Sequence, residues 1–280
     1  MESRDAASIR TAAWILLRDL INERTGMYFD QNSLDLMVDK VSGLMTERDL
    51  DSPADYYYFL KYDGEATGEW ANVVNAISVR ETYFWREIDQ IRSLVEVLVP
   101  QLCERFSEPL RIWSAACASG DEPLTIAMAL DQNRWFDRHP IEIYATDISP
   151  AALCVAEKGV YRERAFRNLP SDLRNRYFVR VPEGWEIDPQ IRRRIIWRRA
   201  NLTSRTDIED LARCRVIFCR NVFIYFTEAV IRKVVNVYEE CMPEPGYLFL
   251  GAAESLLKFT TKFKLEEIGD AFGYMKGRNS

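Results

Sequence analysis

Apolar residues recur at helical spacing through the first quarter of the chain. They repeat at intervals of three and four residues over 9–20 and again over 34–45, which predicts two amphipathic helices. Further along, Ser52 followed by Pro53 and Asp55 is typical of a helix start, because serine caps free N–H groups and proline fits the first helical position. Strand-like alternation is missing from this stretch of sequence. We therefore predict an all-helical N-terminal domain over residues 1–78.

From residue 79 the pattern changes to short apolar runs that alternate with helical segments. The runs are LRIWSAA, IEIYATD, IIWRRANL, CRVIFCRN and GYLFLGAAE, and helical stretches such as PLTIAMAL and AVIRKVVNVYEE lie between them. Alternation of this kind is typical of a parallel sheet covered by helices on both faces. We predict that residues 79–280 form an α/β domain of the doubly wound class.

Two segments depart from the alternation. Residues from about 160 to 198 contain two β-type stretches around a Pro/Gly turn, YFVRVPEGWEI, and predict a small antiparallel β insertion. The last segment, FKLEEIGDAFGYMKG, predicts a terminal hairpin that pairs onto the edge of the sheet.

Composition narrows the class of protein. The chain has 37 Lys+Arg against 43 Asp+Glu, a net charge of −6, and no sustained basic run, which disfavours a nucleic-acid partner. No apolar stretch is long enough to span a bilayer, and the first residues do not resemble a signal peptide. We expect a cytoplasmic protein that does not insert into a membrane.

Histidine and cysteine usage argues against a metal centre. Six cysteines are scattered without a CxxC pair, and His139 is the single histidine, so we expect neither a zinc site nor a disulfide scaffold, and no metal. A Ser-His-Asp or Cys-His mechanism would have to use His139, which lies in the polar segment DRHP. An exposed loop position is the expected one for this residue.

Polar residues follow four of the predicted strands, and ligands of doubly wound sheets bind beyond the carboxyl ends of the strands. The first strand leads into small residues that let a backbone approach a ligand closely. Together these strand ends predict a site for an adenosine ligand. Its candidate residues are Asp121 and Glu122 after the first strand, Asp147 after the second, Asn201 and Leu202 after the third, and Arg220 and Asn221 after the fourth.

The first of these strand ends lacks the GxGxxG pattern. Asp121 and Glu122 stand where a pyrophosphate would need bare N–H groups, which disfavours a dinucleotide-dependent dehydrogenase. The two acids suit a cationic ligand such as S-adenosylmethionine, and they equally suit the first turn of a helix. Asp147 has about the spacing of an acid that binds a ribose, although Asp147 or Ser149 could instead cap a helix.

Five motifs give the chain a resemblance to the CheR family of chemotaxis-receptor methyltransferases. They are RETYFWRE (80–87), RIWSAACASGDEP (111–123), ATDIS (145–149), FCRNVFIYF (218–226) and PGYLFLGAAESL (245–257). The resemblance covers nearly the whole chain and implies a Rossmann-like methyltransferase sheet behind the helical domain. It further implies transfer of a methyl group from S-adenosylmethionine to glutamate side chains of methyl-accepting receptors. S-adenosylhomocysteine would be the product, and receptor cytoplasmic helices the partner.

The resemblance also implies roles for individual residues. Tyr225 matches a tyrosine placed near the transferring methyl, and we hypothesise that Arg86 and Tyr225 orient the substrate carboxylate or the methyl donor. Tyr225 could instead simply pack within the aromatic run FIYF. Arg80 stands where the family usually has Asn. The positions implied to bind the cofactor are Arg80, Thr82, Arg86, Ala116, Glu122, Asp147, Ile148, Asn201, Leu202, Arg220 and Asn221.

Two alternatives stay open. The replacement at Arg80 is compatible with a non-catalytic module that binds S-adenosylmethionine and docks to a receptor. The acid-rich N-terminal domain, in which Asp and Glu outnumber Lys and Arg, is compatible with a methyltransferase of a different acceptor.

Overall fold

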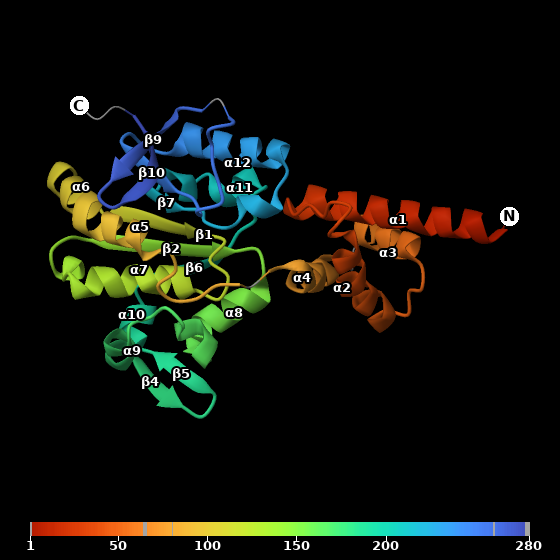
Figure 1. The fold of residues 1–280 in the computed structure, drawn as a ribbon, viewed down its shortest axis with the longest axis horizontal. Coiled ribbons are helices and arrows are strands. Elements are labelled where there is room, and N and C mark those ends of the chain that lie inside the picture. Colours follow the sequence, from red (N-terminus) through yellow and green to blue (C-terminus); the bar gives the residue numbers. More distant parts are fainter. Residues whose placement is uncertain (1, 64–65, 80, 260, 278–280) are drawn as a thin grey trace. The chain divides into compact units, whose positions relative to one another are not determined.

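The computed structural model describes residues 2–63, 66–79, 81–259 and 261–277 (Figure 1). The chain divides into two compact units: Met1–Val79 with Tyr225–Val230, and Arg80–Ile224 with Ile231–Ser280. No helix among the described residues combines the length and the apolar character needed to cross a membrane.

The described residues of the smaller unit form four helices, as the helical periodicity predicts. Of the predicted apolar positions, Leu17, Met37 and Val41 are fully buried in its core, whereas Leu16 is 52% exposed. Ser52 caps the third helix, because its hydroxyl accepts a hydrogen bond from Ala54 N at 3.2 Å, which confirms the predicted helix start. The helices are α1 (Glu2–Thr25), α2 (Leu34–Glu47), α3 (Pro53–Tyr62) and α4 (Ala66–Ile77).

The larger unit is built on a seven-stranded sheet in the order β6-β2-β1-β7-β8-β10-β9. The first five of these strands are parallel, and the predicted terminal hairpin, β9 and β10, adds two antiparallel strands at the β8 edge. The doubly wound prediction is confirmed. The strands are β1 (Leu110–Ala115), β2 (Ile141–Asp147), β6 (Ile195–Arg199), β7 (Val216–Phe218), β8 (Gly246–Phe249), β9 (Phe263–Ile268) and β10 (Ala271–Lys276).

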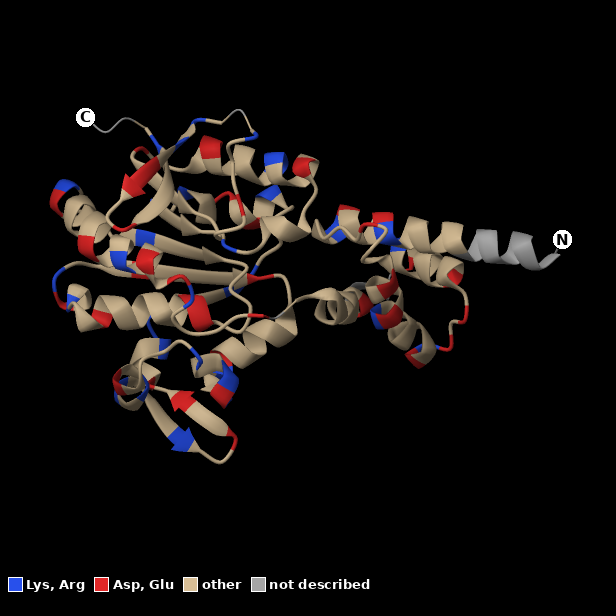
Figure 2. Ribbon diagram, viewed as in Figure 1, with Lys and Arg blue, Asp and Glu red and all other residues tan. Residues whose placement is uncertain are grey.

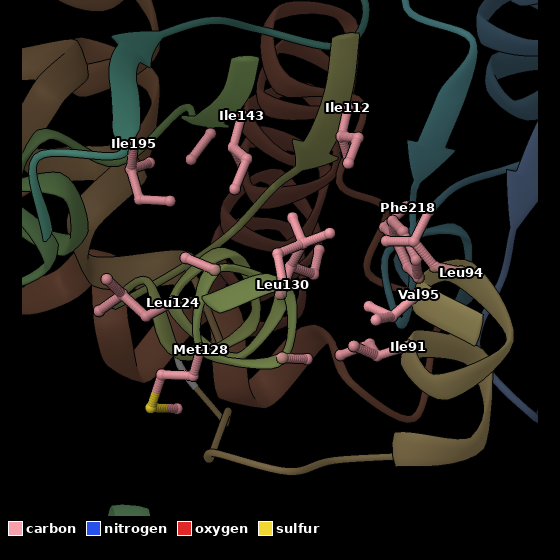
Figure 3. Close-up of a cluster of buried hydrophobic side chains, with 14 of the residues drawn as sticks. Ile91, Leu94, Val95, Ile112, Leu124, Met128, Leu130, Ile143, Ile195 and Phe218 are labelled. Carbon is pink, nitrogen blue, oxygen red and sulfur yellow. The ribbon is translucent and has the colours of Figure 1, made fainter. Parts of the chain in front are cut away.

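Helices cover both faces of this sheet, and neighbouring residues of β1 point to opposite faces. Ser114 donates a hydrogen bond to Glu122 on α7, whereas the Trp113 ring packs edge-on against Tyr238 of α12. Figure 3 shows the apolar core on the α7 side, with Ile112 among its labelled residues. The α-helices are α5 (Ile88–Ser93), α6 (Val99–Arg105), α7 (Asp121–Gln132), α8 (Pro150–Lys158), α9 (Ser171–Tyr177), α10 (Pro189–Arg192), α11 (Arg205–Ile208) and α12 (Glu228–Cys241).

Short helical turns complete the larger unit. The turn η1 (Leu94–Leu98) has π geometry and joins α5 to α6. The others are the 3₁₀ turns η2 (Trp135–Asp137), η3 (Glu163–Phe166), η4 (Leu211–Arg213) and η5 (Phe223–Tyr225).

The predicted insertion forms a separate antiparallel sheet in the order β3-β5-β4. Its strands are β3 (Val160–Tyr161), β4 (Phe178–Val181) and β5 (Gly184–Ile187), and the chain rejoins the large sheet at Ile195. Phe84, which precedes α5, is fully buried among the insertion's aromatic rings and stacks on Phe166 with centroids 5.5 Å apart. The insertion therefore anchors the segment that leads into the seven-stranded sheet.

Candidate active site

The carboxyl ends of β6, β2, β1 and β7 meet at one edge of the sheet. These strands are consecutive neighbours and all run parallel, so the segments that follow them converge. The polar residues that the sequence places after the four predicted strands therefore lie along this edge.

The loop after β1 turns sharply within five residues. Ala116, Ala118 and Gly120 all have positive φ angles, of 56°, 49° and 87°. A Cβ on Gly120 would lie 2.8 Å from the Cβ of Ala156 and 2.8 Å from Cη2 of Trp197, so this position requires glycine. The alanines add little bulk, and the loop backbone stays close to the sheet edge.

Asp147, at the end of β2, ties this loop to the neighbouring strand. Its Oδ2 accepts a hydrogen bond from Ala118 N at 2.9 Å, and its Oδ1 accepts one from Ser149 N at 2.8 Å. The Ser149 hydroxyl in turn accepts from Ala152 N at 3.1 Å and caps α8. Of the two capping candidates, Ser149 is the helix cap, and Asp147 instead faces the loop after β1.

Asp121 and Glu122 occupy the first turn of α7, one of the two interpretations of these acids. Glu122 accepts a hydrogen bond from the Ser114 hydroxyl at 2.6 Å, and its Oε2 lies 2.8 Å from Nε of Arg220, whose side chain is 2% exposed. The charge of Glu122 is thus balanced by an arginine from the end of β7. The sequence could not reveal this pairing, because the two residues are far apart along the chain.

Two titratable groups beside the loop are buried. Burial raises the pKa of the Asp121 carboxyl to about 6, although Ser119 donates a hydrogen bond to its Oδ2 at 2.7 Å. Burial also raises the pKa of the Cys117 thiol well above its usual range, and the nearby Asp147 adds to this shift. Cys117 is therefore held as the neutral thiol and is poorly suited to act as a nucleophile.

Arg220 also joins β7 to the segment before α5. Its terminal nitrogens donate to the carbonyl oxygens of Arg86 at 2.7 Å and Glu87 at 3.2 Å, and to Oε1 of Gln90 at 3.1 Å. An arginine that satisfies a carboxylate and several carbonyls fixes their relative positions. Arg220 thus organises this edge of the sheet.

The segment before α5 contains three further predicted cofactor residues. Arg86 is partly exposed and donates from Nη1 to the carbonyl oxygen of Glu81 at 3.0 Å. Thr82 is partly buried, and Arg80 lies outside the described residues. The backbone of Phe84 donates to the carbonyl of Ala165 at 2.9 Å, so the β insertion holds this segment.

The loop after β6 contains Asn201 and Leu202. Asn201 Oδ1 accepts hydrogen bonds from Thr203 N at 3.0 Å and from the Thr203 hydroxyl at 2.9 Å, which closes a tight turn. Leu202 is buried. Ile148, after β2, is joined to this strand through its carbonyl oxygen, which accepts from Nε of Arg199 at 3.3 Å.

Glu254, for which the sequence predicts no role, lies in the loop after β8. Its carboxylate accepts hydrogen bonds from the backbone N–H groups of residues 221–224 and from Gly251 N. The only signal in the sequence was its position in the motif PGYLFLGAAESL, which says nothing of the loop that it contacts.

Tyr225 belongs to the smaller unit, as does the short segment that follows it up to Val230. Its carbonyl oxygen accepts a hydrogen bond from Tyr28 N at 2.9 Å, and Phe226 forms a β-bridge with Met27. Arg86 belongs to the larger unit. The catalytic roles of Arg86 and Tyr225 stay predictions.

No group of three or more His, Cys, Asp or Glu side chains in the described part of the chain is placed to hold a metal ion. His139 lies in the loop before β2, and its Nε2 is 3.1 Å from the carbonyl oxygen of Glu108, which precedes β1. This is the amino end of the strands, opposite the edge where the candidate residues converge.

Comparison with known proteins agrees with this architecture. Residues 12–78 match the family model described as "CheR methyltransferase, all-alpha domain", and residues 80–272 match "CheR methyltransferase, SAM binding domain". The chain is 35% identical over 267 residues to "Chemotaxis protein methyltransferase 2" of Vibrio cholerae serotype O1, covering 92% of this chain and 91% of the relative. It is 30% identical to "Chemotaxis protein methyltransferase 1" of Pseudomonas aeruginosa, covering 95% and 98% of the two chains.

Proposed function

The chain belongs to the CheR family of methyltransferases, and we propose that it transfers a methyl group from S-adenosylmethionine to glutamate side chains of chemotaxis receptors, forming glutamyl methyl esters. The observation that carries the proposal is the loop of residues 116–120, held by Asp147 at the carboxyl edge of a doubly wound sheet. The domains would be residues 1–78 and 79–280, with the β insertion at about 160–198.

The residues at this edge fit S-adenosylmethionine. The small side chains of Ala116 and Ala118 would let a ligand approach the loop backbone closely. At Gly120 the neighbouring side chains leave no room for a Cβ atom. Asp147 stands where doubly wound sheets hold a ribose, and the buried Leu202 offers an apolar neighbour for a base. We assign cofactor binding to these residues and to Thr82, Arg86, Glu122, Ile148, Asn201, Arg220 and Asn221, and to Arg80 outside the described residues.

The proposed reaction does not require the protein to transfer a proton. When bound, S-adenosylmethionine supplies a methyl group on a positively charged sulfur. A glutamate side chain has a pKa of about 4.3 in water, so the acceptor is already ionised near pH 7 and needs no general base. The task left to the chain is to hold the carboxylate in position and to exclude water around it.

We assign that task to Arg86 and Tyr225. The guanidinium of Arg86 is partly exposed, so it can donate hydrogen bonds to an incoming carboxylate. Tyr225 follows directly after the segment that Glu254 holds. Replacement of Tyr225 by Phe removes only the hydroxyl, and unchanged turnover in that variant would contradict the assignment.

The smaller unit would provide the receptor-docking surface in the cytoplasm. Its helices contain both acidic and basic residues (Figure 2), and Asp35, Asp39 and Glu47 of α2 are exposed. Because opposite charges attract, these acids favour a receptor segment that carries basic residues. We expect the receptor's cytoplasmic helices as partner, with no nucleic acid and no membrane insertion.

The proposal is tested by methyl transfer to a receptor cytoplasmic fragment from the same organism. The protein is incubated with the fragment and with S-adenosylmethionine carrying a radioactive methyl group, and the labelled fragment is then treated with base. Methyl esters release volatile methanol under these conditions, whereas N-methyl groups do not. We expect base-labile label that disappears when a receptor glutamate is replaced by alanine.

The control is the Asp147→Ala variant, which we expect to transfer no label. Base-stable label would show that the acceptor is not a carboxylate. A receptor that stays unlabelled, although the protein binds S-adenosylhomocysteine, would contradict the proposed substrate.

A further inference from the structure

The carboxylate of Glu254 is surrounded by backbone donors. Oε2 accepts from Asn221 N and Gly251 N, both at 2.7 Å. Oε1 accepts from Val222 N at 2.8 Å, Phe223 N at 2.7 Å and Ile224 N at 3.3 Å. One side chain from the loop after β8 thus satisfies every backbone N–H of residues 221–224, the segment that follows β7.

This segment is not held by the hydrogen-bond ladder of the sheet. Asn221 has a φ angle of 58°, which is uncommon for a residue with a side chain, and the ladder of β7 ends before it, at Phe218. Hydrogen bonds to an ionised acceptor are stronger than those between neutral groups. Removal of the carboxylate would leave four consecutive N–H groups without this acceptor.

Gly251 shows that the two loops are packed closely. A Cβ at this position would lie 2.5 Å from Nδ2 and 2.9 Å from the backbone nitrogen of Asn221. The Asn221 side chain therefore rests on the backbone of the β8 loop. Its position depends on the loop that carries Glu254.

The same loop is connected to α5, which contains Gln90. Gln90 donates from Nε2 to the carbonyl oxygen of Leu250 at 2.8 Å, and its Oε1 accepts from Arg220 at 3.1 Å. The proposed cofactor residues Arg220 and Asn221 thus lie between two anchors, Gln90 on one side and Glu254 on the other.

We propose that Glu254 is a positioning residue for the cofactor pocket: its carboxylate holds residues 221–224 so that Asn221 can contact S-adenosylmethionine. This inference rests on the proposed function. Glu254 itself does not contact the cofactor or the receptor glutamate. Its charge is taken up by the backbone donors of the segment that it holds.

The test compares three variants of the full chain. Glu254→Gln keeps the size of the side chain and replaces one acceptor oxygen by an NH₂ group, which cannot accept from the facing N–H groups. Glu254→Asp keeps both oxygens on a shorter stem. Glu267→Gln, at an exposed position of the edge strand β9, is the matched control for loss of one charge. Affinity for S-adenosylhomocysteine is measured by calorimetry, together with thermal unfolding and the KM and kcat of methyl transfer.

We expect Glu254→Gln to weaken S-adenosylhomocysteine binding by about tenfold to hundredfold and to raise the KM for S-adenosylmethionine in proportion. The protein should remain folded at the assay temperature. Glu254→Asp should recover part of the affinity, and Glu267→Gln should match the original chain.

Unchanged affinity in folded Glu254→Gln would overturn the inference, even if the melting temperature falls, because the role would then be structural only. If Glu254→Gln does not fold, Glu254→Asp decides: weakened affinity supports the inference, and unchanged affinity or failure to fold overturns it. Absence of binding by the original chain would instead contradict the proposed function and the inference together.

Discussion

Two loops at the carboxyl edge of the sheet are held in different ways. The loop of residues 116–120 after β1 is tied by Asp147 from the neighbouring strand, and its Gly120 fits against nearby side chains. The segment of residues 221–224 after β7 depends on Glu254, a residue 30 to 33 positions further along the chain. Both carboxylates thus lie about 30 positions further along the chain. The first loop donates one hydrogen bond to Asp147 and has three positive φ angles of its own, whereas four consecutive N–H groups of the second segment all donate to Glu254.

Mutations in the two loops should therefore affect stability and cofactor binding differently. Changes in the first loop strain the backbone locally and should reduce stability and cofactor binding together. Changes in the second segment's anchors should shift its position, with a larger effect on binding than on folding. Substitutions at Arg220, Gly120, Asp121 and Gly251 can test this contrast.

Arg220→Ala should be the most damaging substitution, since Arg220, which directly precedes the second segment, is bound to Glu122 at the start of α7 and to the carbonyl of Arg86 before α5. Breaking a buried ion pair by removing one partner costs about 3–5 kcal/mol. We expect a loss of this size in the free energy of unfolding, measured with urea. Arg220→Lys keeps the charge but loses the fork of donors and should show a smaller loss. A change below about 1 kcal/mol for the alanine variant would contradict the role of Arg220.

Gly120→Ala tests the loop of residues 116–120. The φ angle of 87° and the contacts at 2.8 Å with Ala156 and Trp197 predict both backbone strain and overpacking, with a loss of about 2–4 kcal/mol. The matched control is Gly43→Ala on α2, where a Cβ would meet nothing within 4 Å and helix propensity favours alanine by about 1 kcal/mol. Equal effects of the two substitutions in thermal unfolding would show that the first loop is not constrained as described.

Asp121→Asn should alter the dependence of stability on pH. Burial raises the pKa of Asp121 to about 6 from 3.8, so the folded state binds this proton more tightly than the unfolded state. The ionised carboxyl therefore destabilises the fold above about pH 6, by up to about 3 kcal/mol, and the penalty vanishes as the pH falls towards 4.

The asparagine variant lacks this penalty. We expect it to be more stable than the original chain at pH 7.5, by about 1–3 kcal/mol, and to lose most of that advantage at pH 4.5. The free energy of unfolding in urea at the two pH values provides the check. A difference between the two proteins that does not vary with pH would show that Asp121 does not titrate in this range.

Gly251→Ala should have the smallest effect on stability and a selective effect on binding. The added methyl group would lie 2.5 Å from Nδ2 and 2.9 Å from the backbone nitrogen of Asn221, so the side chain and the backbone of Asn221 must both shift, and we expect a loss of about 1–2 kcal/mol in unfolding. Affinity for S-adenosylhomocysteine should nevertheless fall several-fold. Calorimetry that gives the original affinity would mean that the position of Asn221 is unimportant for the cofactor.

The sequence predicts the fold well because its periodicities are local. The helical stripe that includes Leu17, Met37 and Val41, and the apolar runs of the parallel strands, specify their elements directly, and all are found in the structure. The terminal hairpin and the separate antiparallel sheet are also confirmed.

Only part of the candidate site can be predicted from the sequence. Strand ends identify Asp147 and the loop after β1, because these features depend on neighbouring residues in the sheet. The pairing of Glu122 with Arg220 and the contacts of Glu254 join residues that are far apart in the chain. The spacing of residues along the sequence cannot predict such contacts. Long-range partners of this kind emerge only from the folded arrangement.

The central claim is that the carboxyl edge of the sheet binds S-adenosylmethionine with Asp147 as a principal contact. The most direct test is a calorimetric titration of the protein with S-adenosylhomocysteine, alongside Asp147→Ala, with circular dichroism to establish that both are folded. The account predicts saturable binding at one site that is lost in the variant. A folded original chain that does not bind, or a variant that binds equally well, would contradict it.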